Sequence, residues 1–358
     1  MTVAAAARVE VCIANAGLAG LIAGYFLARD KRSVTVLDEA SFTGPLPPPE
    51  LGQLASVPRQ SCYALEQRHG AQGARVAAQG FAAAIDAIEA IVRRERIACD
   101  FERLDGYCLF PPDEDRRRIE REVAAARSAG VKGAQALPAS PVEGALAAPC
   151  MHHPGLAMLY PARLRAGIAR AIMHEGGRVH GGVGVRSVDA DVRVTPPPGP
   201  GMPAPLAHAI ALRVPRGSVP RALYWDADSG RCARLRTQGM RSSDVLVAAG
   251  FAGEENAPFE ALERWVRLHF PCAREVLQRL SGESPRSPGA LLLAGREADD
   301  ANALLIDEAA CGTPLTRATI AAMVIHDVVA GNRSAAEFQL SSSCYTDATH
   351  RTAAREFA

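Results

Sequence analysis

The sequence predicts an α/β protein with a second domain inserted into the first. Strand and helix patterns alternate near both ends of the chain, around a middle part of mixed character. A β-α-β unit near the N-terminus contains a glycine-rich turn. The length of 358 residues suits about two domains. These three observations together predict the fold class.

The β-α-β unit opens the chain. Val9–Ala14 has the pattern of a buried strand, Asn15–Gly17 that of a turn, and Leu18–Arg29 that of a helix. A β-branched strand, Ser33–Leu37, follows and ends at Asp38. The nearly continuous apolar run through this unit is about 20 residues long, enough to cross a bilayer. Its central small residues favour a strand, a tight turn and a helix instead, so no membrane span is expected.

The remaining elements are predicted from periodicity. From Cys99 to Phe110 the alternating pattern predicts two strands around a turn at Asp105-Gly106. Further helices are expected over 63–94, 113–129, 163–175, 259–269 and 316–330. Further strands are expected over 178–188 (a pair), 208–214, 222–226, 245–249, 290–293 and 303–306.

Two proline-rich stretches, Gly44–Pro49 and Thr195–Pro205, mark loops or linkers because proline lacks a backbone donor. We therefore expect a discontinuous nucleotide-binding-type domain and a substrate domain. The first comprises 1–60, 146–196 and 284–345, the second comprises 61–145 and 197–283, and 346–358 form a C-terminal tail.

Composition argues against several classes of function. Lys and Arg number 40 against 39 Asp and Glu, a net charge of +1, which does not suit a nucleic-acid or membrane-surface binder. Nine cysteines without a C-x-x-C pair indicate reduced thiols in a cytoplasmic protein and no cysteine-based metal site. The expected partner is therefore a small-molecule substrate; nothing in the sequence indicates the oligomeric state.

The glycine-rich turn resembles a dinucleotide-binding fingerprint, G-x-G-x-x-G followed by an acid about 20 residues on. The chain has Asn15-Ala16-Gly17-Leu18-Ala19-Gly20 and then Asp38. Asparagine adopts left-handed conformations more readily than most residues, so Asn15 can keep the tight turn that the first glycine normally makes. The alternative is a well-packed β-α-β unit in which Gly17 and Gly20 serve only helix packing.

Read with other segments, this turn makes the chain similar to a known family. The sequence resembles the FAD-dependent oxidoreductases of the D-amino-acid oxidase / glycine oxidase superfamily, from about Val9 to Gly331. Its closest-looking branch often carries a C-terminal Rieske domain, which we do not expect in 358 residues. The resemblance rests on Ile13–Leu21, Val34–Asp38, Cys99–Tyr107 and Val214–Pro220.

The resemblance implies a Rossmann-like FAD/NAD(P)-binding fold with an inserted mixed-sheet substrate domain. It also implies an oxidoreductase that acts on an amine or an amino acid, with flavin as the redox group. Arg296 follows Gly295 where the family has a Gly-Arg pair near the flavin, and a guanidinium there can pair with a substrate carboxylate. The implied cofactor-binding residues are Asn15, Ala16, Gly17, Gly20, Asp38, Val185, Gly312 and Thr313.

Three segments depart from the family pattern. Phe42–Pro49 replaces a donor-rich loop around the pyrophosphate, Val192–Pro198 looks shortened, and Asp307–Thr316 keeps only Gly312 of a glycine-rich stretch. Since these segments contact FAD in relatives, the sequence predicts an atypical flavin site. A flavin-free descendant that catalyses a non-redox step, such as cyclisation, elimination or isomerisation, is the alternative. A non-catalytic partner of an active relative is a third possibility.

Candidate catalytic residues are Arg296, Tyr160 and Asp307, the last two as acid–base groups in a cleft that has lost its flavin. The histidine pair His152-His153 is interpreted as a loop or a satisfied pair. Neighbouring side chains of an extended segment point to opposite faces and do not readily share a metal ion.

Overall fold

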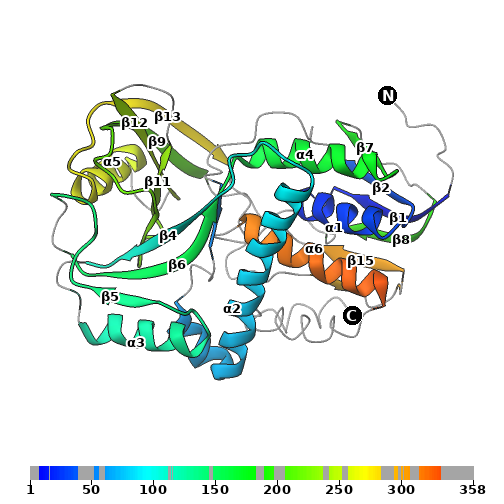
Figure 1. Cartoon of the computed structure of the whole chain (residues 1–358), viewed down its shortest axis with the longest axis horizontal. Coiled ribbons are helices and arrows are strands. Elements are labelled where there is room, and N and C mark those ends of the chain that lie inside the picture. Colours follow the sequence, from blue (N-terminus) through cyan, green and yellow to red (C-terminus); the bar gives the residue numbers. More distant parts are fainter. Residues whose placement is uncertain are drawn as a thin grey trace.

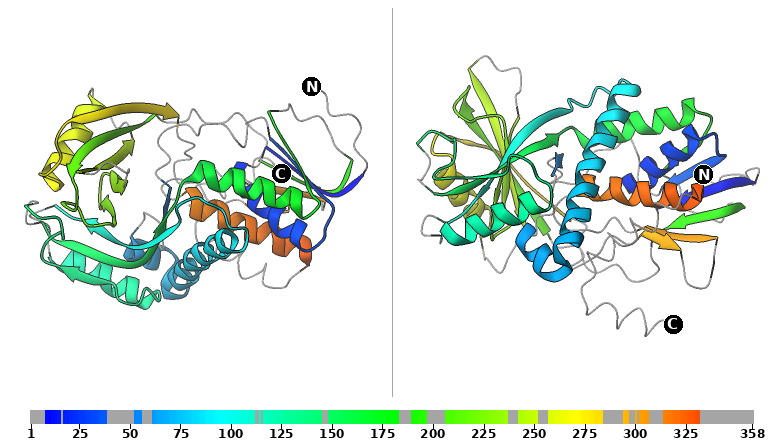
Figure 2. Two further views of the ribbon diagram at one scale, coloured as in Figure 1. Left: turned by 45° about the horizontal axis from the view of Figure 1, so that its top comes forward. Right: turned by 60° about the horizontal axis from the view of Figure 1, so that its bottom comes forward.

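The computed structural model of the protein places two β-sheets side by side, with helix α2 (Cys62–Arg94) between them (Figures 1 and 2). The described residues are 8–15, 17–38, 52–55, 61–111, 114, 116–144, 148–182, 189–196, 206–236, 242–251, 257–283, 294–296, 300, 302–306 and 314–331. A mixed α/β fold is therefore confirmed.

The first sheet has six strands, and its central strand is β1 (Val9–Ala14). Neighbouring strands run parallel except at one edge, where β14 pairs with β15 antiparallel. The strand order is β14 (Ala294–Arg296), β15 (Ala303–Ile306), β8 (Ala190–Thr195), β1, β2 (Val34–Asp38) and β7 (Arg178–Gly181). The strand–turn–helix interpretation of the first apolar run is confirmed.

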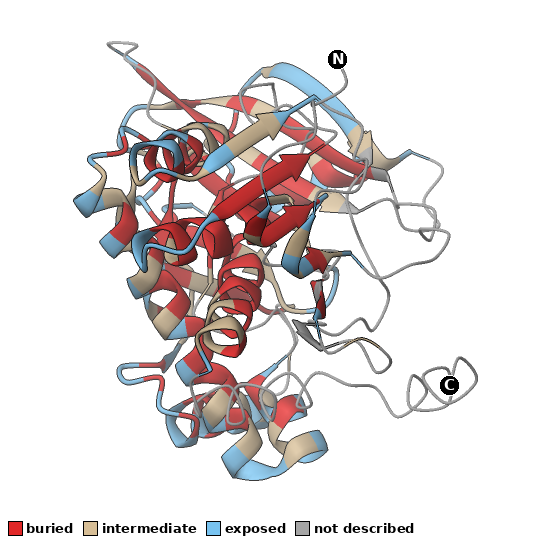
Figure 3. Cartoon of the chain, turned by 90° about the vertical axis from the view of Figure 1, so that its right-hand side faces the viewer, coloured by how far each residue is buried: buried red, intermediate tan, exposed pale blue. Residues whose placement is uncertain are grey.

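Helix α1 (Gly17–Arg29) packs against this sheet between α4 (Pro161–His174) and α6 (Pro314–Ala330). Most of its residues are buried, because it contacts a strand layer on one side and helices on the other. In Figure 3 many strand and helix residues are buried, whereas the outer helix faces reach solvent, and strands β7 and β8 of this sheet also expose residues. None of the described helices is long and apolar enough to cross a membrane.

The second sheet has nine strands and is mixed, because β10 and β4 pair in parallel while the other pairs are antiparallel. Its strands are β3 (Gln53–Leu54), β4 (Glu102–Leu109), β5 (Gln135–Leu137), β6 (Cys150–Met158), β9 (Leu206–Pro215), β10 (Leu223–Asp226), β11 (Cys232–Arg236), β12 (Ser243–Phe251) and β13 (Val276–Glu283). Helix α5 (Pro258–His269) packs on β9 and β12.

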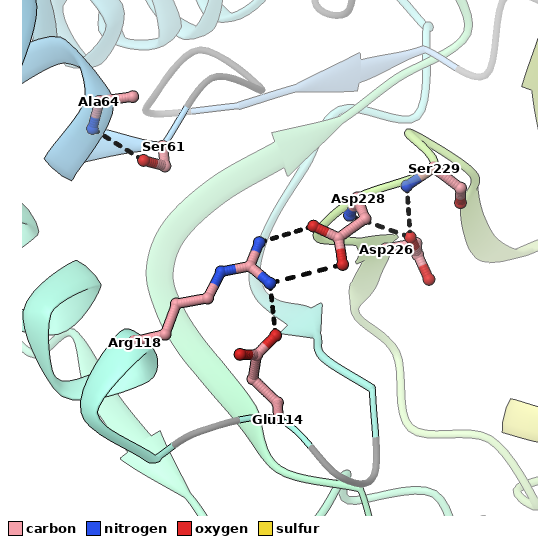
Figure 4. Close-up of polar contacts among 7 residues, drawn as sticks. All are labelled: Ser61, Ala64, Glu114, Arg118, Asp226, Asp228 and Ser229. Atoms are coloured by element: carbon pink, nitrogen blue, oxygen red, sulfur yellow. Dashed lines mark hydrogen bonds and ion pairs between the residues drawn. The ribbon is translucent and has the colours of Figure 1, made fainter.

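Helix α2 starts at a serine cap and bends at a glycine. The Ser61 hydroxyl accepts a hydrogen bond from the Ala64 amide at 2.8 Å (Figure 4), which satisfies one of the free donors of the first turn. Gly70 has a φ of 72°, a left-handed value that interrupts the helix. Beyond this kink the helix continues to Arg94, and it contacts both α3 and α6.

One arginine joins helix α3 (Arg116–Ser128) to the mixed sheet. The Arg118 guanidinium pairs with Glu114 and donates to Asp228 at 2.6 Å, in the turn between β10 and β11 (Figure 4). Asp226 shapes that turn by accepting the amides of Asp228 and Ser229 at 3.1 and 2.6 Å. The Arg118–Asp228 ion pair thus holds α3 against the hairpin formed by β10 and β11.

The hairpin predicted at Asp105-Gly106 is wrong. One strand, β4, runs through this position, and its pairing with β6 shifts register between Leu104 and Gly106. A Cβ on Gly106 would lie 2.3 Å from Leu156 Cδ1 and 2.6 Å from Trp225 Cζ3. The register shift places two residues of β6 opposite one residue of β4, and Gly106 leaves room for the Leu156 and Trp225 side chains, so no turn is formed.

Other differences concern elements that local patterns did not predict. The unpredicted strands are β3, β5, β6, β8, β11, β13 and β14. Of these, β3 and β6 pair in the mixed sheet although they lie in segments assigned to the nucleotide-binding-type domain. The domain boundaries stay a prediction. The strand predicted over 290–293, the second half of the strand pair over 178–188 and most of both proline-rich stretches lie outside the described residues.

The contact between α1 and β2 depends on Gly24, since a Cβ there would lie 2.7 Å from Val36 Cγ2. We predict that Gly24→Ala lowers the free energy of unfolding by about 1–3 kcal/mol, because a packed interior cannot accept an added methyl group without strain. Urea denaturation measures this change. In a Val36→Ala background the same substitution should cost much less; an equal cost would refute the contact as its cause.

Candidate cofactor and substrate site

The turn after β1 has the backbone conformation that a nucleotide fingerprint requires. Asn15 has a φ of 52° and Gly17 a φ of 50°, both left-handed. The Asn15 amide donates to the Leu37 carbonyl at 2.9 Å, which ties the turn to the end of β2. Asparagine thus replaces the first glycine of the motif without loss of the tight turn. This agrees with the expectation from the sequence.

The turn, the start of α1 and Asp38 come together at one edge of the parallel sheet. β1 and β2 are parallel, so their carboxyl ends meet there, and Asp38 is the last residue of β2. The first turn of α1 contains no acidic residue, so the positive end of its dipole is not neutralised by a carboxylate of that turn. Such an edge is where open α/β sheets bind their ligands.

This donor set fits the ADP portion of a dinucleotide. Amides at a helix N-terminus suit a pyrophosphate, and a carboxylate at the end of the second strand suits ribose hydroxyls. Gly20 is buried in α1, as the motif requires, although the close approach to β2 occurs one turn later, at Gly24.

Several of the predicted site residues cannot be placed at this edge of the parallel sheet. Ala16, Val185, Asp307, Gly312 and Thr313 lie outside the described residues. The backbone of Arg296 ends β14 and pairs with Leu304, at the antiparallel edge of the sheet.

Tyr160 lies where the chain passes from the mixed sheet to the helices of the parallel sheet. It follows β6, precedes the first residue of α4, and its amide donates to the Cys99 carbonyl at 2.8 Å. Three guanidinium carbons surround its ring, those of Arg163, Arg234 and Arg236, at 4.9, 5.8 and 5.0 Å from the centroid. In addition, Arg236 Nε donates to the phenol oxygen at 2.7 Å.

Two of these three arginines have no carboxylate partner among the described residues. Arg163 pairs with Asp100 at 2.9 Å. Arg234 is 5% exposed; its Nη1 lies 3.8 Å from the Met158 sulfur, and its buried Nε makes no hydrogen bond. Burial lowers the pKa of its guanidinium below the usual value. We call Tyr160, Arg234 and Arg236 the arginine–tyrosine cluster.

Sequence reasoning singled out Tyr160 but missed Arg234 and Arg236. Their signal was two arginines at i and i+2 in an otherwise apolar segment, Cys232–Arg236. In a strand this spacing places both side chains on one face, yet nothing local shows that Tyr160, 76 residues from Arg236, lies against them.

The histidine pair belongs to β6, not to a loop. His152 Nε2 lies 3.0 Å from Asp105, whereas the His153 ring lies 5.4 Å from that of Trp225. His153 is 3% exposed, and its Nδ1 has no hydrogen-bond partner. Desolvation, with a smaller contribution from His152, lowers its pKa to about 4. No three His, Cys, Asp or Glu side chains in the described part of the chain are arranged to hold a metal ion.

Comparison with known families agrees with the geometry of the first sheet. Residues 10–202, more than half of the chain, match the DAO family, described as FAD dependent oxidoreductase. The chain belongs to this family. The site described above is therefore that of a chain from the DAO family of FAD dependent oxidoreductases. No curated protein sequence matches the chain.

Several solved structures share the fold of this chain over nearly its whole length. Glycine oxidase from Geobacillus kaustophilus aligns with a TM-score of 0.71 at 16% identity, over 92% of this chain and 96% of that one. Iminodiacetate oxidase from Chelativorans sp. BNC1 has a TM-score of 0.63 at 16% identity, over 90% and 96%. L-amino acid deaminase from Proteus vulgaris, with its specific insertion deleted, has a TM-score of 0.68 at 12% identity, over 93% and 92%. Both sheets therefore belong to a known fold, a Rossmann-like FAD/NAD(P)-binding domain with an inserted mixed-sheet domain.

The buried neutral His153 predicts a pH dependence of stability. Its pKa is about 4 in the folded chain, against an ordinary value of 6.5 for a solvated histidine, so the unfolded chain takes up the proton first as pH falls. The free energy of unfolding should therefore fall by about 3 kcal/mol between pH 6.5 and 4 through this residue. Urea denaturation at several pH values measures the slope.

Replacing the histidine should remove that part of the slope. We expect His153→Gln to be less sensitive to acid than the wild type between pH 6.5 and 4. His174→Gln, a change at an exposed histidine in the last turn of α4, is the matched control and should leave the slope unchanged. Identical slopes for the wild type and His153→Gln would contradict the assignment.

Proposed function

We propose that the protein binds FAD and oxidises the carbon–nitrogen bond of an amino acid or amine. The observation that supports this most is the left-handed Asn15 turn, which keeps the start of α1 and Asp38 together at the carboxyl edge of the parallel sheet. Loss of the first motif glycine therefore does not imply loss of nucleotide binding.

In this proposal Gly17 and the first amides of α1 hold the pyrophosphate, Gly20 lets the helix pack, and Asp38 accepts ribose hydroxyls. Asn15 holds the turn. The family resemblance assigns Ala16 to the same motif, the Val185 backbone to the adenine, and Gly312 and Thr313 to the flavin. A bound FAD would supply the oxidising power, as the acceptor of a hydride from the carbon next to the substrate nitrogen. Loss of one proton from that nitrogen would balance the reaction and give an imine product.

The protein's own groups orient the substrate. Arg296 pairs with a substrate carboxylate, and Asp307 accepts the proton that leaves the nitrogen. Tyr160, at the junction of the two sheets, contacts the substrate from the mixed-sheet side. The similar folds of a glycine oxidase, an iminodiacetate oxidase and an L-amino acid deaminase support an amino or imino acid as substrate class.

A second candidate is a flavin-free enzyme of the same fold that catalyses a non-redox step, or a non-catalytic partner. Prolines at 45 and 47–49 and acids at 307 and 308 favour it, because relatives use donor-rich loops at these places to hold FAD. Tyr160 and Asp307 would then serve as acid–base groups.

Flavin binding separates the two candidates. We predict that the purified protein, supplied with FAD, shows the two visible absorption bands of a bound flavin. Gly17→Val should abolish these bands, because its added side chain opposes a φ of 50° and occupies the place of the phosphates. Visible spectra after gel filtration measure the retained flavin.

The matched control is Gly331→Val. It replaces another left-handed glycine, with a φ of 72°, that ends α6 in open space. This variant should keep the flavin bands. A colourless wild-type protein that takes up no FAD would contradict the proposal and favour the flavin-free candidate.

A further inference from the structure

The arginine–tyrosine cluster is a concentration of positive charge that no acid among the described residues neutralises. Arg234 and Arg236 lie on the same face of β11, and both guanidinium groups lie against the ring of Tyr160. The neighbouring Arg163 pairs with Asp100, so its charge is balanced. The described residues provide no acid for the other two.

Such an arrangement is unfavourable without a ligand. Taking a guanidinium out of water costs free energy unless its donors are paired, and two like charges beside one ring repel each other. Arg234 is 5% exposed and its buried Nε makes no hydrogen bond. An apolar side chain at position 234 or 236 of β11 would be buried at a lower cost in free energy. Packing alone therefore does not explain why the strand carries two arginines there.

The donors present define the ligand that would balance them. Planar guanidinium groups match the two oxygens of a carboxylate, and the Tyr160 hydroxyl oxygen already accepts a hydrogen bond from Arg236 Nε. The phenol's own proton therefore remains to donate to a ligand oxygen. Arg236 and Tyr160 are half-buried, so the cluster can be reached from the Tyr160 side.

The position of the cluster relates it to the substrate. Tyr160 immediately precedes α4, which packs on α1, whose first turn lies at the nucleotide edge of the parallel sheet. The arginines belong to β11 of the mixed sheet, whereas α1 and α4 pack with the parallel sheet (Figure 1). The substrate carboxylate assigned above to Arg296 uses a different element, β14.

We propose that Tyr160, Arg234 and Arg236 bind a second carboxylate of the substrate, which makes acidic amino or imino acids the preferred substrates. This inference rests on the proposed function, in which Arg296 takes the first carboxylate. A substrate with one carboxylate would leave two guanidinium charges unbalanced. A dicarboxylic substrate would bring a second carboxylate to the cluster while Arg296 takes the first.

The test compares two unreactive probes of nearly the same shape. Glutarate carries two carboxylates, and its monoamide carries one. Titration calorimetry of the full-length protein should show glutarate binding about tenfold to a hundredfold more tightly, since charge-assisted hydrogen bonds to the second carboxylate are lost in the amide. Steady-state rates with glutamate against glutamine, in both enantiomers, should show the same preference in kcat/KM.

Variants locate the preference. Arg234→Met and Arg236→Gln should each bring the affinities for glutarate and its monoamide to within about threefold, and Tyr160→Phe should reduce the difference partly. Arg116→Met, at an exposed arginine of α3 that pairs with Glu120, is the control and should keep the full difference. Circular dichroism and thermal melts establish that each variant is folded.

The two proposals fail differently. Equal affinities for glutarate and its monoamide in the wild type, or a preference that survives in both Arg234→Met and Arg236→Gln, would overturn this inference. A protein that binds FAD and oxidises glutamate and glutamine equally would leave the proposed function standing without the second carboxylate site. A protein that binds no FAD but prefers glutarate through these arginines would overturn the proposed function and keep the anion site.

Discussion

The close packing of α1 on the parallel sheet sets the positions of both halves of the molecule. Gly24 lets the helix approach Val36, and the Asn15 amide ties the preceding turn to the end of β2. These two contacts direct the start of the helix at the sheet edge where Asp38 ends its strand. Both α4 and α6 pack on α1, and α6 also packs on α2, the helix between the two sheets. The position of α1 therefore also influences how the mixed sheet is held.

The mixed sheet is organised in a different way from the parallel sheet. Its curled mixed sheet brings together side chains from strands that are far apart in the sequence, as at Tyr160 and Arg236. Burying a charge without a partner costs free energy. Arg234 and Arg236 on β11 have no acid partner among the described residues, so they say more about function than the exposed ion pairs of the surface do. Tyr160 belongs to the cluster and immediately precedes α4, which packs on α1, the helix that starts at the nucleotide edge.

Local sequence patterns predicted the first sheet better than the second. The unit from Val9 to Asp38 was predicted because its glycines, apolar run and β-branched strand act over short distances. The bulge at Gly106 was mistaken for a turn, since only the distant Leu156 and Trp225 show why a glycine is needed there. The arginine–tyrosine cluster was missed for the same reason: Tyr160 contacts Arg234 and Arg236 through the pairing of strands, not through sequence spacing.

The proposed FAD-dependent oxidation requires that the nucleotide edge has survived the loss of the first motif glycine. Calorimetric titration of the flavin-free protein with ADP and with FAD tests this requirement without relying on turnover. We expect saturable binding of both, with FAD binding more tightly than ADP because it makes further contacts. If neither nucleotide binds to a folded protein, then Asn15, α1 and Asp38 serve packing alone, and the nucleotide edge has been lost.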